Sequence, residues 1–120
     1  MADEITLDCS LLYEKNGVRI TPPLGQLSID VAGNELVHQV QLIGITEEAI
    51  YMGSDVGTPG IAVFKNLDPT NFISIRRATG EGNFLKILPG EHAVLRLVAA
   101  APFAIADTAA CRMEYWIFEV

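Results

Sequence analysis

Side chains that could catalyse a reaction are few and widely spaced in this sequence. The candidate nucleophiles are Ser10, Ser28, Ser54 and Ser74, and the candidate bases are His38 and His92. A hydrolytic site needs a nucleophile, a base and an orienting acid within hydrogen-bond reach of one another. None of the serines lies in a G-x-S-x-G elbow. We therefore expect no catalytic residue and no enzymatic activity, with His38 at the edge of the core and His92 in solvent.

Metal and cofactor ligands are just as sparse. The two cysteines and two histidines lie at spacings that match no zinc motif. Asp55 and Asp68 lie in loops that lack the regular spacing of calcium ligands, and turn chemistry explains both better. The glycines at 57–60 and 80–82 match no nucleotide-binding fingerprint and open no helix. We predict no metal site and no cofactor.

The sequence is acidic, with 15 Asp and Glu against 8 Lys and Arg and a formal net charge of −7. Nucleic-acid binding draws its affinity from basic side chains on phosphates, and the one basic doublet here is Arg76-Arg77. Direct binding to nucleic acid or to an anionic membrane is therefore disfavoured. No apolar run approaches the ~18 residues of a transmembrane helix, and the acidic start lacks the features of a signal peptide. We expect the protein to stay in a cytoplasm or to be assembled there into something larger.

The two cysteines, Cys9 and Cys111, lie near opposite ends of the chain. They could be neighbours if the terminal strands paired, so the sequence leaves their pairing open. Reducing conditions favour free thiols, and free cysteine is usually buried. We therefore expect two buried free thiols.

The elements that position these side chains are predicted to be short strands. Residues 5–14 alternate between apolar and polar as a half-buried strand does, and Asn16-Gly17 predicts a type I′ turn into a return strand. Similar runs, separated by turns rich in Gly, Pro, Asn and Asp, continue to the C-terminus. About eight short strands without a long helical period predict an all-β protein, an antiparallel β-sandwich like a jelly roll, in a single domain over residues 1–120.

The stretch from Gly60 to Ile75 is predicted to be a hairpin that organises the rest. Residues 61–64 are apolar on both faces, which favours a central strand, and residues 65–71 collect turn-forming residues. In the second strand, the side chains of Ser74, Arg76 and Arg77 are expected to point outward.

Two other segments carry specific expectations. Thr46 to Ala49 is predicted to form a single helical turn, because a threonine cap precedes two acids. The last strand, residues 111–119, is largely apolar on both faces and should be covered on both sides. Tyr115 and Trp116 in that strand are expected in the core, with a sugar-binding face as the alternative.

Half of the residues are hydrophobic, which is high for 120 residues. A small domain has little interior in which to bury so many apolar groups. We therefore expect apolar surface to be buried against further copies of the chain or against a partner, in addition to a packed core.

The segments ITEEAIYMGSDVGTPGIAVFKNLDPTNFISI, FLKILPGEHAVLRL and RMEYWIFEV, which carry the match over residues 46–119, resemble small structural proteins encoded among the virion genes of tailed bacteriophages. That group shares a TPG-x-hydrophobic-KNLD-x-TN-aromatic stretch, a later PGE turn and an apolar C-terminal strand ending in Glu. The resemblance implies a virion component without enzymatic activity, assembled in the host cytoplasm.

Within that group, the resemblance best fits a capsid decoration (cement) protein that binds the head lattice. The expected partners are sister copies in a homotrimer and the major capsid protein or another virion protein. A tail-, neck- or fibre-associated protein is the first alternative, and a small lectin-like sandwich that binds glycans through Trp116 and Tyr115 is the second. Interface candidates are the loops at 53–60 and 78–83 and the segment before Ile5, because their composition indicates flexible segments and loops commonly carry contacts.

Overall fold

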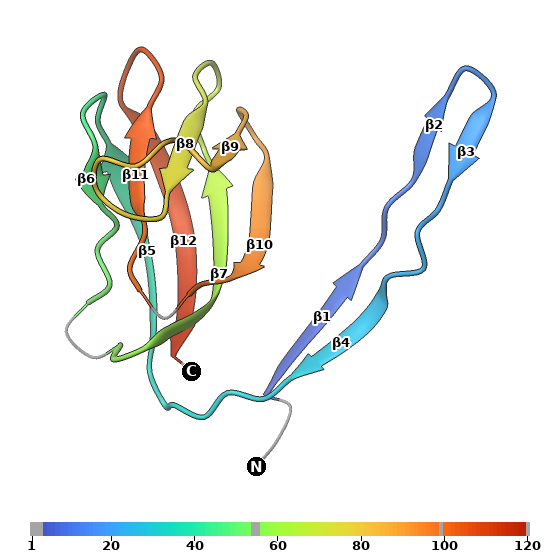
Figure 1. Ribbon diagram of the computed structural model, residues 1–120, viewed down its shortest axis with the longest axis horizontal. Coiled ribbons are helices and arrows are strands. Elements are labelled where there is room, and N and C mark those ends of the chain that lie inside the picture. Colours follow the sequence, from blue (N-terminus) through green and yellow to red (C-terminus); the bar gives the residue numbers. More distant parts are fainter. Residues whose placement is uncertain (1–3, 54–55, 99, 120) are drawn as a thin grey trace. The chain divides into compact units, whose positions relative to one another are not determined.

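The structure, a computed structural model (Figure 1), describes residues 4–53, 56–98 and 100–119. These residues form twelve β-strands and no helix, which confirms the all-β prediction. The chain divides into two compact units, Met1–Ala32 and Gly33–Val120. We call them the ribbon and the body. The sandwich occupies the body, whereas the sequence predicted one sandwich over all of residues 1–120.

The ribbon is a long two-stranded antiparallel hairpin. It contains β1 (Ile5–Cys9), β2 (Tyr13–Lys15), β3 (Val18–Ile20) and β4 (Gly25–Ile29), with β1 paired to β4 and β2 paired to β3. Asn16 and Gly17 have φ values of 51° and 78°, and a type I′ turn requires positive φ at both positions. The predicted turn is therefore confirmed. Pro22 and Pro23 separate β3 from β4, because proline cannot donate a hydrogen bond to the ladder.

The body consists of two four-stranded antiparallel sheets (Figure 1). Its strands are β5 (Leu36–Ile43), β6 (Glu48–Ala49), β7 (Pro59–Asn66), β8 (Ile73–Arg76), β9 (Leu85–Ile87), β10 (His92–Arg96), β11 (Phe103–Ala106) and β12 (Cys111–Glu119). The sheet orders are β10-β7-β12-β5 and β6-β11-β8-β9. Counted along the body, these are strands 6-3-8-1 and 2-7-4-5, the order produced by two Greek keys folded together. The predicted jelly-roll-like sandwich is thus confirmed for the body.

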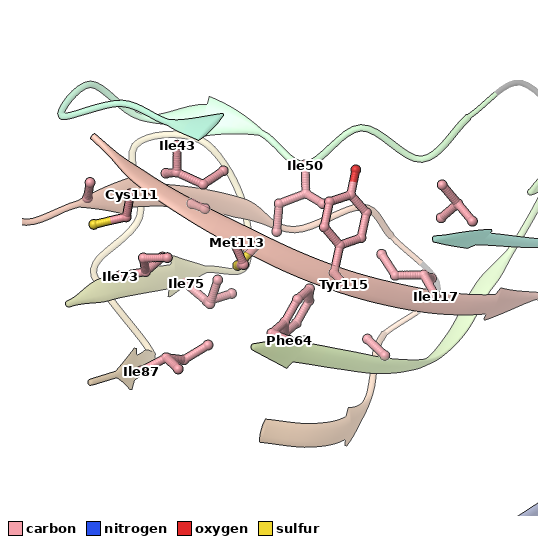
Figure 2. Packing of buried hydrophobic residues seen from close by; sticks show 14 residues of the cluster. Ile43, Ile50, Phe64, Ile73, Ile75, Ile87, Cys111, Met113, Tyr115 and Ile117 are labelled. Atoms are coloured by element: carbon pink, nitrogen blue, oxygen red, sulfur yellow. The ribbon is translucent and has the colours of Figure 1, made fainter. Parts of the chain in front are cut away.

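The core lies between the two sheets and is centred on β12 (Figure 2). Met113, Tyr115 and Ile117 alternate along β12, point inward and are fully buried. Phe64 from β7 and Ile73 from β8 meet them from the two sheets. The opposite face of β12 is half-buried to exposed, so the prediction that this strand is covered on both sides was wrong. Its outward apolar residues have no further layer within the described chain.

The predicted hairpin over residues 60–75 was also wrong, although β7 is a central strand as expected. β7 lies in one sheet and β8 in the other, so the chain crosses between the layers. The buried Asn66 side chain holds this crossing. Its Nδ2 donates to the carbonyls of Asn71 and Ile87, at 2.9 and 3.0 Å, and its Oδ1 accepts from the Asp68 amide at 2.9 Å. A buried amide that binds both layers replaces the hydrogen bonds that a hairpin would have supplied.

Asp68 completes the crossing by ordinary turn chemistry, as predicted. Its Oδ2 accepts the backbone N–H groups of Thr70 and Asn71, at 2.9 and 2.6 Å. These two hydrogen bonds lower the pKa of the Asp68 carboxyl, and the one from Asn71 has the larger effect. The crossing is therefore organised by its own polar side chains.

Two smaller expectations also fail. Thr46 to Ala49 forms no helical turn, because Glu48 and Ala49 form the short edge strand β6 against β11. Ser74 is buried, with 3% of its surface exposed, because β8 lies between β11 and β9. In both cases, pairing with a strand distant in sequence determines the local structure.

Glu119 ties the end of β12 to two earlier segments of the body. Its Oε1 accepts the Asn34 amide at 3.0 Å, and its Oε2 accepts the Gly57 amide at 2.6 Å. A Cβ on Gly33 would lie 2.2 to 2.6 Å from the Glu119 side chain, so a larger residue there would displace the Glu119 carboxylate. The hydrogen bonds from Gly57 and Asn34 lower the pKa of the Glu119 carboxyl.

Glu119→Gln is expected to weaken the acid dependence of body stability. A carboxylate whose folded pKa is depressed adds stability above its ordinary pKa of 4.5, and loses it as the pH falls through the folded pKa. The amide retains only one acceptor oxygen and does not titrate, so E119Q should be less stable at neutral pH and lose less on acidification. Urea unfolding at about pH 3 to about pH 7 measures this. Glu81→Gln, which breaks an exposed ion pair with Arg77, is the control and should behave like the parent protein.

Candidate functional site

The structure describes all but one of the residues first considered for catalysis, and it distributes them over the ribbon and several strands of the body. Ser10 and Ser28 lie in the ribbon, Ser74 is buried in β8, and Ser54 lies outside the described residues. Within the described part of the chain, no three His, Cys, Asp or Glu side chains cluster closely enough to hold a metal ion. The sites that remain to be considered are surfaces.

His38 lies on the outer face of β5 and is exposed, as is His92 at the start of β10. The His38 ring stacks on Trp116 with ring centroids 4.4 Å apart and an interplanar angle of 8°. Its Nε2 lies 2.9 Å from the Glu114 Oε2. His38 lies opposite Trp116 on the neighbouring strand, so its imidazole ring contacts side chains of β12. The expectation that His38 lies at the edge of the core was therefore wrong, because its side chain is exposed on the outer face of β5.

The outer face of the β10-β7-β12-β5 sheet carries a first apolar surface. We call it the outer sheet face. Its apolar members include Leu36, Val40 and Leu42 of β5, Val63 of β7, Val94 of β10, and Trp116 and Phe118 of β12. They share this face with the charged residues Lys65, Arg112 and Glu114. Leu42 is 58% exposed, and Arg112 lies opposite it on β12. Such a surface fits a protein partner better than a small ligand, because it is built on the nearly continuous ladder of a sheet.

A second apolar surface is a groove of about 580 Å³ at the edge of the sandwich. It is lined by residues of the edge strands β9 and β10, by the end of β8 and by the loops that follow β8 and β10. Leu85, Leu95 and Leu97 form its floor, since they also pack against the core. Phe84 and Val98 stand at its rim, 79% and 77% exposed. We call this feature the groove.

The loop at 78–83 forms one wall of the groove and is held in place by Glu47. The carboxylate of Glu47 accepts hydrogen bonds from the Thr79 hydroxyl and the Gly80 amide, and it pairs with Arg76 at 2.8 Å. These contacts lower the pKa of Glu47, and the hydrogen bond from Thr79 has the largest effect. The loop was predicted as an interface from its flexible composition, but side-chain hydrogen bonds order it.

The other two interface candidates are only partly described. In the loop at 53–60, residues 54–55 lie outside the described residues, the Gly57 amide binds Glu119, and Gly60 is buried. Of the segment before Ile5, only Glu4 is described. Its carboxylate accepts the Val31 amide at 2.8 Å. Both segments therefore have structural roles wherever the structure describes them.

The ribbon carries the third apolar surface. Ile5, Leu7, Leu27 and Ile29 oppose one another across β1 and β4 and so share a face, while Asp8 and Gln26 on the other face hydrogen-bond at 3.0 Å. Residues 5–14 were predicted to be half-buried, yet much of this ribbon is exposed. The alternation of apolar residues was the available signal, and it did not reveal how many of these residues are exposed.

The two cysteines differ in their surroundings. Cys111 is fully buried and Cys9 is exposed, and both are free thiols. Burial raises the pKa of the Cys111 thiol, with smaller contributions from Asp68 and Asp107. The expectation of two buried thiols is thus confirmed for Cys111 and wrong for Cys9, which is exposed on β1 in the two-stranded sheet of β1 and β4.

Tyr115 and Trp116 cannot form one sugar-binding platform, because consecutive residues of β12 point to opposite faces. Tyr115 is fully buried (Figure 2), and its hydroxyl donates to the Tyr51 carbonyl at 2.5 Å. Trp116 lies on the outer sheet face under the His38 ring. The core expectation holds for Tyr115, and Trp116 is only half-buried.

Alkaline titration should reveal Tyr115 as a late-titrating phenol. Burial raises its pKa to about 12, so its ionisation absorbance should appear near that pH and disappear in Tyr115→Phe. A raised folded pKa means that the neutral phenol stabilises the body up to about pH 10, and that this contribution is lost as the pH rises further. Loss of the bond to the Tyr51 carbonyl should cost about 1–2 kcal/mol. Tyr51→Phe is the control, because it changes an exposed side chain and keeps the backbone carbonyl that Tyr115 binds. It should leave the late titration in place.

No protein-family profile, curated protein or solved structure matches this chain. The described residues contain no helix that is long and apolar enough to cross a bilayer.

Proposed function

We propose that this protein is a capsid decoration protein of a tailed bacteriophage, which binds the head lattice as a homotrimer and clamps neighbouring coat subunits. The proposal combines the resemblance of residues 46–119 to small virion structural proteins with the apolar surfaces of the body. The observation that carries it is the presence of two separate apolar surfaces, the outer sheet face and the groove, on one small domain.

A protein that clamps a lattice needs two kinds of contact. One joins it to its sister copies, and the other joins the oligomer to the coat. Monomeric soluble proteins rarely expose large contiguous apolar patches, and such patches usually mark interaction sites. The outer sheet face suits the coat, because it is a broad surface supported by four paired strands. The groove suits a narrower element of a sister copy.

The resembling motifs occupy positions that set the fold. Asn66 and Asp68 of the KNLD motif hold the crossing between the sheets. In the PGE turn, Gly90 has a φ of 79° and the Glu91 carboxylate accepts the Leu88 amide at 2.9 Å. Positive φ is costly for residues with a side chain, so glycine is favoured there. The resemblance therefore supports a shared architecture, and the proposed function extends it to a shared role.

Counting the protein in purified virions tests this proposal. Copy numbers on the order of hundreds per particle, comparable with the three-fold positions of the head lattice, are expected for a decoration protein. A dozen copies or fewer would instead assign it to the tail, neck or fibres, and absence from the particle would overturn the virion role. Leu42→Asp places a charge on the outer sheet face and should reduce binding to undecorated heads.

A further inference from the structure

We propose that the ribbon of one copy docks into the groove of a second copy, so that the chain assembles by exchanging its N-terminal arm. The inference rests on the apolar face of the ribbon, the shape and charge of the groove and the short connection between the two units. It does not depend on the virion role, because both surfaces belong to this chain.

The ribbon has an apolar face and no layer of its own to bury it. An isolated two-stranded hairpin is marginally stable in water, and a third strand or a packing surface is needed to stabilise it. Leu27 on β4 is 54% exposed, and Tyr13 and Ile20, which oppose each other on β2 and β3, are about as exposed. The ordered ribbon therefore needs a cover of apolar character and limited width.

The groove offers such a cover. Its floor of Leu85, Leu95 and Leu97 is continuous with the core and hence rigid, while Phe84 and Val98 extend from its rim into solvent. The edge strands β9 and β10 flank it, so an incoming ribbon would lie beside unpaired strand edges. Both partners of this contact are apolar at the centre, as the core of a stable interface is.

The charges of the two surfaces are complementary. The described part of the ribbon, residues 4–32, has four carboxylates against two basic side chains, a net charge of −2. The groove is lined by Arg76, Arg77 and Arg96 with Glu81 as its only acid, a net charge of +2 in a chain of net charge −7. Arg76 and Arg77 are paired with Glu47 and Glu81, but the Arg96 guanidinium has no ion-pair or hydrogen-bond partner among the described residues. A carboxylate on an incoming ribbon would supply one.

The connection between the units favours transfer of the ribbon as a preformed arm. The Val31 amide is bound by Glu4 within the ribbon, and the Asn34 amide is bound by Glu119 within the body. Only Ala32 and Gly33 lie between these two anchored positions. Because every copy has one arm and one groove, a closed ring of copies satisfies all of these surfaces, and closed symmetric oligomers are the usual outcome of such contacts.

Solution mass with paired variants tests the contact from both sides. The parent protein should have a mass that is a multiple of 13.0 kDa, near 39 kDa for three copies. Leu27→Asp on the apolar face of the ribbon and Phe84→Asp at the groove rim should each weaken assembly at least about tenfold. Ser28→Asp, on the polar face of β4, and Leu42→Asp, on the outer sheet face, should retain the parent mass.

Cross-linking with mixed isotopes separates exchange from docking within one chain. Cys9 is exposed in the ribbon and Cys111 is buried, so Asn83→Cys adds one reactive thiol beside the groove. A short bismaleimide is applied to a mixture of light and heavy copies of this variant. In an exchanged assembly, about half of the cross-links between position 83 and Cys9 should join a light to a heavy chain. Cys9→Ser in the same background is the control and should give no such product.

Three results would overturn the proposal. They are a parent protein that stays a single chain at high concentration, an oligomer that survives both Leu27→Asp and Phe84→Asp, and cross-links that never join light to heavy chains. Failure of the virion role gives a different pattern, in which the assembly and its response to these variants persist while the protein is absent from virions. Retained assembly of Leu42→Asp with lost head binding would support both proposals separately.

Discussion

Replacing Phe64 with alanine is expected to lower the free energy of unfolding of the body by about 3–5 kcal/mol. Phe64 lies on the central strand β7, is fully buried and packs in the cluster around Met113 and Tyr115 (Figure 2). Its removal loses the transfer free energy of an aromatic ring and leaves a cavity that two hydrogen-bonded sheets cannot close. A domain of this size has a total stability of about 5–15 kcal/mol, so the variant should lose a large share of its stability.

The control for this prediction lies on the same strand. Val63 points to the opposite face of β7 and is half-buried, so Val63→Ala should cost only about 1 kcal/mol. Phe64→Leu keeps an apolar side chain and should fold with an intermediate loss. Guanidinium unfolding at one fixed protein concentration measures all three, because assembly would shift the apparent stability. Equal losses at positions 63 and 64 would contradict the layered core.

Replacing Asn66 with aspartate is expected to destabilise the body about as strongly, by about 3–5 kcal/mol at neutral pH. Aspartate has nearly the same shape, but it lacks the Nδ2 group that donates to the Asn71 and Ile87 carbonyls. The variant would place a carboxylate against two carbonyl oxygens at a site with no exposed surface. Buried polar groups without a partner, and buried charges above all, carry the largest penalties known for single substitutions.

The pH dependence of this variant provides the decisive measurement. Protonation of the aspartate removes the buried charge and restores one donor, so the difference in stability between N66D and the parent protein should shrink as the pH falls toward about 4. Asn83→Asp, at an exposed amide that binds Arg76 at 2.6 Å, should show a small difference at every pH. A mild effect of N66D at neutral pH would mean that the crossing from β7 to β8 does not depend on this amide.

Much of the candidate interface could be anticipated only in outline. The excess of hydrophobic residues indicated unburied apolar surface, and the structure places such surface on the outer sheet face, in the groove and on the ribbon. The loop at 78–83 was expected to be flexible, yet Glu47, distant in sequence, orders it. Trp116 was expected in the core with Tyr115, but the two residues lie on opposite faces and only Tyr115 is fully buried.

Local properties of the sequence determined the strands, their faces and the tight turns. Alternation of apolar residues depends on neighbours two positions apart, and Asn16-Gly17 forms its turn because both residues accept positive φ. The tertiary structure decided which strands of the body pair with one another. It sent β7 and β8 to different sheets, made a strand of Glu48 and Ala49, buried Ser74 and paired β1 with β4 in a sheet of their own. A strand's own residues specify which face is apolar but not which distant surface will cover it, because that depends on the arrangement that buries the most surface across the whole chain.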